Sequence, residues 1–237
     1  LPGDRKGLAR LRHHTQAKCK RHAWGIAPGR RRVSSVRIMR EYGIPRPDVL
    51  ITSLGTEIHY SPGLTRDRVW SRHVDHLWHH WEAERILEDI PGLEKQSKLE
   101  QSVFKLSYYI DPDVAPSMQE IRSLLHMREL TVNVVQSFGQ FLDIVPVRAS
   151  KGFALRWYCD QREVPVEQVL AAGGSGADED MMRGNTLAVL VANRHHEELS
   201  DLAEAERIFF ATRPFAGGIL EALEHYDFFG ACRAPEE

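Results

Sequence analysis

The chain has 237 residues, 42% of them hydrophobic, and its 31 Lys and Arg against 33 Asp and Glu leave a formal net charge of −2 at pH 7. This near balance gives no general attraction to nucleic acid or to a membrane surface, and no apolar run approaches the roughly 18 residues of a membrane span, so neither partner is expected. The length suits one large or two small domains with a buried core.

The first part of the chain alternates predicted helices and strands. The spacing of apolar residues predicts a surface helix over residues 8–19 and a second helix over 34–42. Short apolar runs predict buried strands over 23–27 and 49–53, and an alternating strand follows at 57–60. This order of elements is typical of a doubly wound parallel sheet.

The middle of the chain has a different pattern. Residues 70–89 predict one long aromatic-rich helix, and alternation over 104–110 predicts an antiparallel strand. A helix over 117–126 and strands over 131–136 and 140–145 follow. We interpret this β-α-β-β unit as a cap inserted between two halves of a parallel sheet.

A lysine loop and a glycine-rich loop lie in the stretch 140–178. An apolar run at 141–145 precedes Ser150-Lys151-Gly152 and a helix over 153–162, and a second run at 169–172 leads into the turn 173–178. We interpret this order as a parallel β-α-β crossover, with both loops at the carboxyl ends of its strands. A lysine and an acid meeting there suit a phosphorylated ligand and a hard cation.

The remaining elements complete an α/β fold. Strands are predicted over 188–192 and 207–211, and a closing helix over 216–228. The predicted domains are a core formed by residues 1–65 and 149–237, and an α+β cap formed by residues 66–148.

Several motifs, in consistent order, resemble one phosphatase family. They are RPDVLITSLGTEIHY at 46–60, LEQSVFKLSYYIDP at 99–112, Leu142-Asp143, Ser150-Lys151-Gly152 and GGSGAD at 173–178. Together they resemble sucrose-6-phosphate phosphatases of the haloacid dehalogenase superfamily, and most closely the phosphatase-like domain at the C-terminus of bacterial sucrose-phosphate synthases. The resemblance runs from Gly3 to Phe229 and implies a Rossmann-like core with an inserted α+β cap that binds sugar.

The resemblance also implies roles for individual residues. It makes Lys151 a catalytic residue and assigns phosphate binding to Gly29, Arg30, Lys151 and Ser175. It assigns sugar binding to a set from the core and the cap: Gly55, Thr56, Glu57, Gln101, Lys105, Ser107 and Asp143. It makes Asp178 a ligand of Mg²⁺, the cofactor that the family implies, and sucrose 6-phosphate the ligand.

Departures from the family pattern predict that phosphatase activity is weak. The family's nucleophilic aspartate and its acid–base partner align before Leu1, so we expect the physiological chain to begin earlier, since a sheet without that strand would leave two unpaired edges. Pro28 stands where a threonine is expected and has neither a hydroxyl nor an N–H to donate. Gly174 and Ala177 replace an expected metal-binding aspartate and an asparagine. Loss of one such contact typically costs about 10²–10³ in rate.

Three functions follow as hypotheses. The first is a catalytically weakened sucrose-phosphatase-like domain of a sucrose-phosphate synthase, which binds sucrose 6-phosphate, the synthase's glycosyltransferase domain or a separate phosphatase. The second is an active Mg²⁺-dependent phosphatase whose nucleophile strand lies upstream, with Asp178 or Asp180 rebuilding the metal site. The third is a purely structural dimerisation module. The odd, scattered cysteines Cys19, Cys159 and Cys232 indicate a reducing, cytoplasmic location for all three.

Simpler interpretations of some residues stay open. The cluster His73, His76, His79 and His80 is either a metal site or, as we favour, a solvated or stacking cap helix. The near-helical spacing of Trp70, Trp78 and Trp81 favours a packed face over a sugar platform. Lys105 and Glu57 are alternatively exposed surface charges, and Lys151 is alternatively a surface lysine at a helix start.

Overall fold

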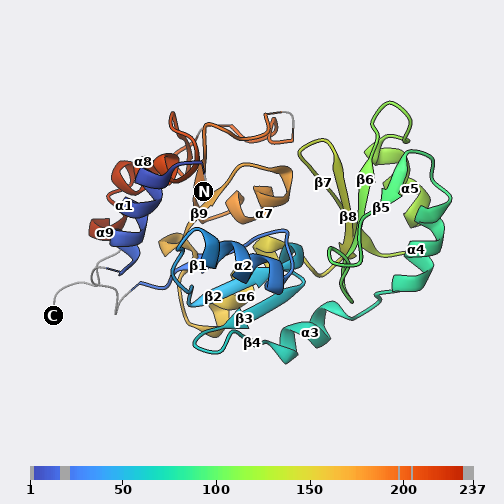
Figure 1. Ribbon diagram of the computed structural model, residues 1–237, viewed down its shortest axis with the longest axis horizontal. Coiled ribbons are helices and arrows are strands. Elements are labelled where there is room, and N and C mark those ends of the chain that lie inside the picture. The colour runs from blue at the N-terminus through green and yellow to red at the C-terminus, as the bar shows by residue number, and fades with distance from the viewer. Residues whose placement is uncertain (1–2, 17–21, 197, 204, 232–237) are drawn as a thin grey trace.

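A computed structural model describes residues 3–16, 22–196, 198–203 and 205–231. Helices flank two groups of parallel strands at one end of the molecule, and an antiparallel sheet with its own helices forms the other end (Figure 1). This is the predicted α/β core with an inserted α+β cap. No helix in these described ranges is both long and apolar enough to span a membrane.

The first sheet contains four strands in the order β1-β2-β3-β4. The elements up to this sheet's last strand are α1 (Arg5–Gln16), β1 (Gly25–Ile26), α2 (Arg32–Glu41), β2 (Val49–Thr52), the 3₁₀ turn η1 (Ser53–Gly55), β3 (Glu57–Tyr60) and β4 (Thr65–Arg66). Only β1 and β2 are parallel. The predicted buried strand at 23–27 is wrong in extent and in burial, because only two residues pair with β2 and Gly25 is exposed at the sheet edge.

The cap is built on a four-stranded antiparallel sheet in the order β5-β6-β8-β7. Its elements are α3 (Arg68–Val74), α4 (His80–Glu88), β5 (Leu93–Lys95), β6 (Leu106–Ile110), α5 (Met118–Met127), β7 (Val132–Ser137) and β8 (Phe141–Pro146). Leu106, Leu142 and Ile144 are fully buried in one cluster with residues of α4 and α5. The helices therefore cover one face of the cap sheet, and the other face is left for the core.

The predicted single helix over residues 70–89 is wrong. The chain breaks into α3 and α4, and Leu77 between them has a left-handed φ of 58°. The two helices pack into different cores, since Trp70 and Val74 belong to the cluster of Ile51 whereas Leu87 belongs to the cap cluster. The tryptophans therefore share no face: Trp70 is 1% exposed and Trp81 is 81% exposed.

The predicted β-α-β crossover over 140–178 is also wrong. The strand β8 pairs antiparallel with β6 and β7 in the cap sheet, whereas β9 (Leu170–Gly173) belongs to another sheet. The helix α6 (Lys151–Gln161) therefore starts where the chain returns from the cap to the core. An apolar run in the sequence indicates that a strand is buried, but it does not indicate which sheet the strand joins.

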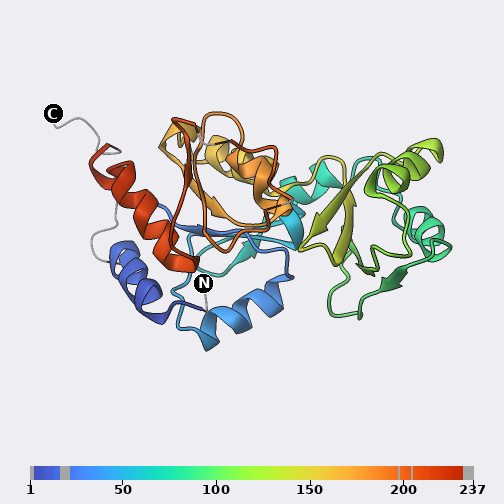
Figure 2. The same ribbon diagram turned by 90° about the horizontal axis from the view of Figure 1, so that it is seen from above.

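The last sheet is parallel, with the order β11-β10-β9. The elements from the end of α6 onward are η2 (Val166–Gln168), β9, η3 (Gly176–Asp178), α7 (Glu179–Met182), β10 (Leu187–Leu190), β11 (Ile208–Phe210), α8 (Phe215–His225) and α9 (Phe228–Ala231). Figure 2 shows α2 on one side of the core strands and α6 with α7 on the other. Among the described residues, β1 and β9 have one strand partner each, so each leaves one edge unpaired.

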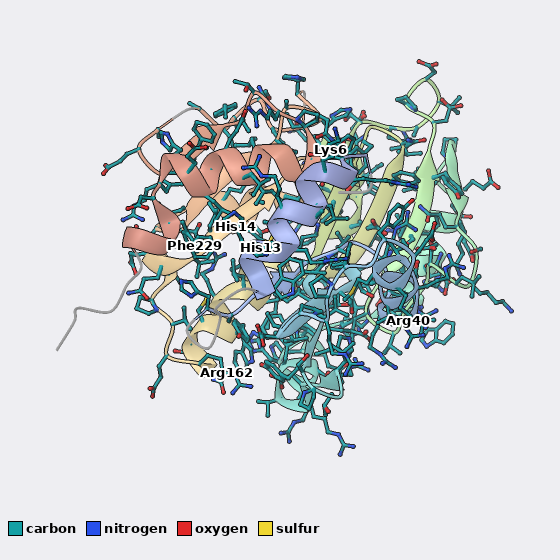
Figure 3. All side chains as sticks on the ribbon, turned by 60° about the vertical axis from the view of Figure 1, so that its left-hand side comes forward. Lys6, His13, His14, Arg40, Arg162 and Phe229 are labelled. Atoms are coloured by element: carbon teal, nitrogen blue, oxygen red, sulfur yellow. The ribbon has the colours of Figure 1, made fainter. Side chains whose placement is uncertain are left out.

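The N-terminal helix α1 packs on α8, the last long helix of the described chain. Leu8 and Leu11 of α1 are buried in one cluster with Ala216 and Leu220 of α8. Figure 3 shows Lys6, His13 and His14 along α1, with Phe229 stacked on His14 at 5.8 Å between ring centres. The two ends of the described chain thus stabilise the same side of the core.

Candidate active site

Lys151 is the buried cation of the site. It is the first residue of α6, whose N-terminus is capped by Ser150, with the Ser150 Oγ accepting from the Phe153 N–H at 2.9 Å. Lys151 is 5% exposed, and its Nζ donates to Asp178 Oδ1 at 2.7 Å. The structure therefore brings together the lysine and the acid that the sequence singled out.

The Asp178 carboxylate organises the glycine-rich loop. Its Oδ2 accepts from the backbone N–H of Gly174 at 3.0 Å, from the N–H of Ser175 at 3.1 Å and from the Ser175 hydroxyl at 3.0 Å. Burial alone would raise the pKa of Asp178, but the charge of Lys151 and these hydrogen bonds outweigh burial and lower it. Both carboxylate oxygens are therefore occupied by groups of the protein.

The predicted phosphate loop lies against η1. The Cβ that Gly29 lacks would lie 3.2 Å from Leu54 Cδ2, and the carbonyl of Arg30 accepts from the Ser53 N–H at 2.9 Å. The Arg30 side chain is exposed. Through η1 the structure thus places Gly29 and Arg30 beside the loop that contacts Lys151.

Gly55 fits tightly against the start of α6. Its φ is +88°, and a Cβ at this position would lie 2.0 Å from the Ser150 carbonyl oxygen and 2.7 Å from the Lys151 N. The Gly55 carbonyl accepts from the Trp70 indole N–H at 2.9 Å. The glycine is therefore required for the close approach of η1 to Lys151.

The neighbouring residues Thr56 and Glu57 are held within the first sheet. Thr56 is fully buried, and its hydroxyl has no hydrogen-bond partner in the described part of the chain. Glu57 lies 3.4 Å from His59 Nε2 and 3.5 Å from Arg66 Nη2. The hydrogen bond from His59 is the main cause that lowers the pKa of Glu57, against an opposing effect of burial. The partners of the Glu57 carboxylate thus belong to the first sheet and not to the cap residues predicted to bind sugar.

The four predicted sugar-binding residues of the cap form one network, in which Lys105, Ser107 and Asp143 are buried and Gln101 is half-buried. Lys105 Nζ donates to Asp143 Oδ1 at 3.0 Å and to Ser107 Oγ at 2.5 Å, and the Ser107 hydroxyl donates to Asp143 Oδ1 at 2.5 Å. The Gln101 amide accepts from the Ser107 N–H and donates to the Ser107 carbonyl, both at 2.8 Å. Lys105 is 3% exposed, so the surface-lysine interpretation of this residue is wrong.

Loss of the Ser107 hydroxyl is expected to destabilise the cap. The change Ser107→Ala removes two hydrogen bonds inside a buried charged network, which typically costs about 1–3 kcal/mol of unfolding free energy. The matched control is Ser102→Ala in the loop before β6, because the Ser102 hydroxyl has no partner among the described residues. Urea unfolding of both variants measures the difference, and equal effects would contradict a structural role for Ser107.

The described residues do not assemble a magnesium site. They contain no group of three or more His, Cys, Asp or Glu side chains arranged to hold a metal ion. Asp178 is occupied as above, and Asp180 Oδ2 accepts from the Gly152 N–H at 2.9 Å. A hard cation needs about six oxygen ligands, so neither carboxylate alone fits it.

Glu198 is a site residue that the sequence did not indicate. Its Oε1 accepts from the Gly139 N–H of the cap and its Oε2 from the Gly176 N–H of the core, both at 2.8 Å. Its side chain is 9% exposed. We call this pair of hydrogen bonds the Glu198 clamp. No sequence motif indicates it, because it depends on two loops that lie far from Glu198 in the sequence.

A cleft separates the cap from the core next to Lys151. It has a volume of about 620 Å³ and extends from Asn133 and Val135 of the cap to Lys151 and Ala177 of the core. The cap and the core also meet where Arg31 Nη1 donates to the carbonyls of Lys98 and Leu99 at 3.3 and 3.4 Å. The loop before Lys105 therefore contacts the segment that follows Arg30.

Three features together define a haloacid dehalogenase-type fold. They are an α/β core with parallel strands, an inserted antiparallel cap, and a lysine–aspartate pair located where the chain re-enters the core after the cap. A haloacid dehalogenase-like hydrolase from Bacillus subtilis superposes with a TM-score of 0.62 at 17% identity over 95% of this chain and 86% of its own, which supports the fold. The chain belongs to the sucrose-6F-phosphate phosphohydrolase family, whose model matches residues 1–227.

Individual relatives agree with this membership. The solved sucrose-phosphatase of Synechocystis sp. PCC6803, in complex with sucrose and phosphate, has a TM-score of 0.90 and 28% identity, over 95% of this chain and 93% of that one. A probable sucrose-phosphatase 3b of Arabidopsis thaliana is 30% identical in an alignment of 203 residues, with a coverage of 80% of this chain and 47% of the relative. The mannosylfructose-phosphate phosphatase of Agrobacterium fabrum is 26% identical over 80% of this chain and 77% of its own. The chain thus spans about half the length of the plant relative.

Proposed function

We propose that this chain binds a phosphorylated disaccharide, with sucrose 6-phosphate as the first candidate, and that its phosphatase chemistry is weakened. The observation that carries the proposal is the buried Lys151, a cation of the kind that binds phosphate, beside a loop in which Gly174 supplies no carboxylate. In this proposal the phosphate lies near Gly29, Arg30, Lys151 and Ser175. The sugar lies toward Gly55, Thr56, Glu57 and the cap network.

Two residues support the weakened chemistry. Pro28 offers a phosphate neither a hydroxyl nor an N–H. Asp178 already accepts one hydrogen bond from Lys151 and three from the 174–175 loop, so it supplies little to a cation. Without a second carboxylate at position 174, Mg²⁺ would need ligands from outside the described residues.

The proposal extends to the role of such a domain. We place the core at residues 1–65 and 149–237 and the sugar-binding cap at 66–148, in a cytoplasmic sucrose-phosphate synthase. The domain would bind sucrose 6-phosphate, the glycosyltransferase domain or a separate phosphatase, and so serve regulation or product channelling. The similarity to sucrose-phosphatases supports the ligand.

A second candidate is an active Mg²⁺-dependent phosphatase. The observation that favours it is the pair of edge strands β1 and β9, each of which has one strand partner among the described residues. A further parallel strand carrying an Asp-x-Asp sequence between them would add two carboxylates to those of Asp178 and Asp180. Magnesium would then share Asp178 and Asp180 with the groups that hold them now.

Restoration of the missing groups tests both candidates. Phosphate release from sucrose 6-phosphate is measured with Mg²⁺ for the complete native polypeptide and for the variant Pro28→Thr with Gly174→Asp. Slow release by the native protein and a gain of about 10²–10³ on restoration are expected. A Cβ at position 174 would lie 3.2 Å from Val191 Cγ2 and 3.3 Å from Arg194 Cα, so the neighbours must yield by a few tenths of an ångström.

A control separates chemistry from binding. Adding Lys151→Met to the restored variant is expected to remove the gain, because the phosphate would lose its cation and the Asp178 loop would lose its ion pair. Calorimetric titration of the native protein with sucrose 6-phosphate, compared with sucrose, measures binding without turnover. Rapid release by the unmodified protein would exclude the weakened enzyme, and absence of any phosphosugar binding would exclude both candidates.

A further inference from the structure

The charges of this chain are unevenly distributed along the sequence. Residues 1–46 contain 13 of the 31 Lys and Arg residues but only 2 of the 33 Asp and Glu residues, whereas the rest of the chain contains 18 and 31 of them. The net charge of −2 therefore combines a strongly basic first part with an acidic remainder. Such a local excess creates a positive potential that attracts partners of opposite charge.

The helix α1 presents part of this excess to solvent. Leu8 and Leu11 are buried against α8, so the other side of α1 carries the exposed side chains of Arg5, Lys6 and Arg10. No acidic residue occurs within α1. The side chains of these three basic residues make no hydrogen bond or ion pair with another described residue. Their charges are therefore available to a partner.

The helix α2 continues the basic surface. Its exposed residues Val33, Arg37 and Arg40 recur at the spacing of one helix face. The end of α2 adjoins α1, because Arg12 of α1 donates to the Gly43 carbonyl at 3.3 Å. In Figure 2 both helices lie along the same side of the core strands. We call this surface the basic face, and its members are Arg5, Lys6, Arg10, Arg37 and Arg40.

Two exposed apolar side chains border the basic face. Val33 is 73% exposed and Leu99 is 76% exposed. Both lie beside Arg31, which is two positions from Val33 and donates to the Leu99 carbonyl at 3.4 Å. Arginine is enriched at protein–protein interfaces, whose centres are apolar. The surface thus combines charge with an apolar contact, as a site for another protein requires.

We infer that the basic face, together with Val33, docks a protein partner whose surface presents carboxylates around an apolar side chain. The guanidinium group binds carboxylates in a bidentate geometry. A nucleic acid or a membrane extends beyond one face of the molecule and would meet acidic residues, since Glu224 and Asp227 are exposed on and just after α8, the helix that packs against α1. A protein surface of matching size avoids this repulsion. The inference does not depend on the proposed function, because no residue of the basic face lines the cleft beside Lys151.

Fluorescence anisotropy with the full chain tests the inference. The probe is a labelled helical peptide that places Leu among Glu residues, and a poly-glutamate peptide of equal charge serves for comparison. The Glu–Leu peptide is expected to bind with a dissociation constant on the order of 10 μM in about 0.1 M salt. Binding should weaken at least about tenfold in about 1 M salt, where the Debye length falls from about 10 Å to about 3 Å.

Variants of the basic face separate its charge from its apolar contact. Arg37→Glu combined with Arg40→Glu is expected to weaken binding of the Glu–Leu peptide at least about tenfold, because attraction becomes repulsion. Arg37→Gln combined with Arg40→Gln removes the charges without reversing them, and it should weaken binding several-fold. Val33→Ser should weaken binding of the Glu–Leu peptide several-fold and leave that of poly-glutamate unchanged.

The matched control changes the net charge by the same amount elsewhere. Arg85→Glu combined with Arg128→Glu alters two exposed side chains of the cap that also make no hydrogen bond or ion pair with another described residue, and it should leave binding unchanged. Equal weakening in this control, binding that does not depend on salt, or no binding of the Glu–Leu peptide would each overturn the inference. Tighter binding of duplex DNA or of phosphatidylserine vesicles than of the peptide would also overturn it.

Discussion

Replacement of Lys151 by methionine is expected to lower the free energy of unfolding by about 3–5 kcal/mol. The variant keeps most of the apolar stem but removes the charge that lies 2.7 Å from Asp178 Oδ1. The Asp178 carboxylate would then be buried without its cation, and the loop that it organises would lose support. Urea unfolding at neutral pH measures the loss, and a cost below about 1 kcal/mol would contradict the assigned pairing.

The matched control for this prediction removes both charges. Lys151→Met combined with Asp178→Asn should recover part of the lost stability, because no unpaired charge stays buried. The pH dependence follows from the lowered pKa of Asp178. A carboxyl with a depressed folded pKa stabilises the fold above its unfolded pKa of about 3.9, and that contribution is lost as the pH falls through the folded pKa. Asp178→Asn alone should therefore flatten the acid side of the stability profile.

Gly55→Ala is expected to be the most damaging single methyl addition at the site. The new Cβ would lie 2.0 Å from the Ser150 carbonyl oxygen, which is backbone and cannot rotate away. The clash would push η1 away from the start of α6, and several kcal/mol of stability would be lost together with the position of Lys151.

A comparison with Gly184 separates the effect of the steric clash from the effect of the left-handed backbone conformation. Gly184 has nearly the same φ, +84° against +88°, but no atom lies within 4 Å of the position of its Cβ. Gly184→Ala should therefore cost only the strain of a left-handed alanine, about 1–2 kcal/mol. Urea unfolding of the two variants gives the comparison, and equal losses would show that the contact with Ser150 is not tight.

The fold class was predictable from the sequence, because the patterns that indicate helices and strands are local and the family motifs can be identified along the chain. Ser117 begins α5 with a capping box to Glu120, as an amphipathic pattern after a serine indicates. The sheet membership of β8 was not predictable in the same way, because an apolar run is compatible with either sheet. The break at Leu77 was missed because tertiary packing decides it: α3 and α4 pack into different cores.

The candidate site was predictable where a charged residue lies in a loop with a recognisable sequence pattern. Lys151 follows a serine cap and Asp178 ends a glycine-rich turn, and the structure joins them. The inner cap network was indicated only by resemblance, since nothing in the spacing of Lys105, Ser107 and Asp143 predicts that strands β6 and β8 pair them. The exposure of Trp81 was missed because helical periodicity grouped it with the buried Trp70.

The Glu198 clamp restricts how the two halves of the molecule move. One carboxylate holds a cap loop through Gly139 and a core loop through Gly176, so the distance between these loops stays nearly constant while both hydrogen bonds persist. Separation of the loops would break two charge-assisted bonds, whereas rotation about the carboxylate would keep them. The Glu198 carboxylate therefore opposes separation of the cap from the core at this contact.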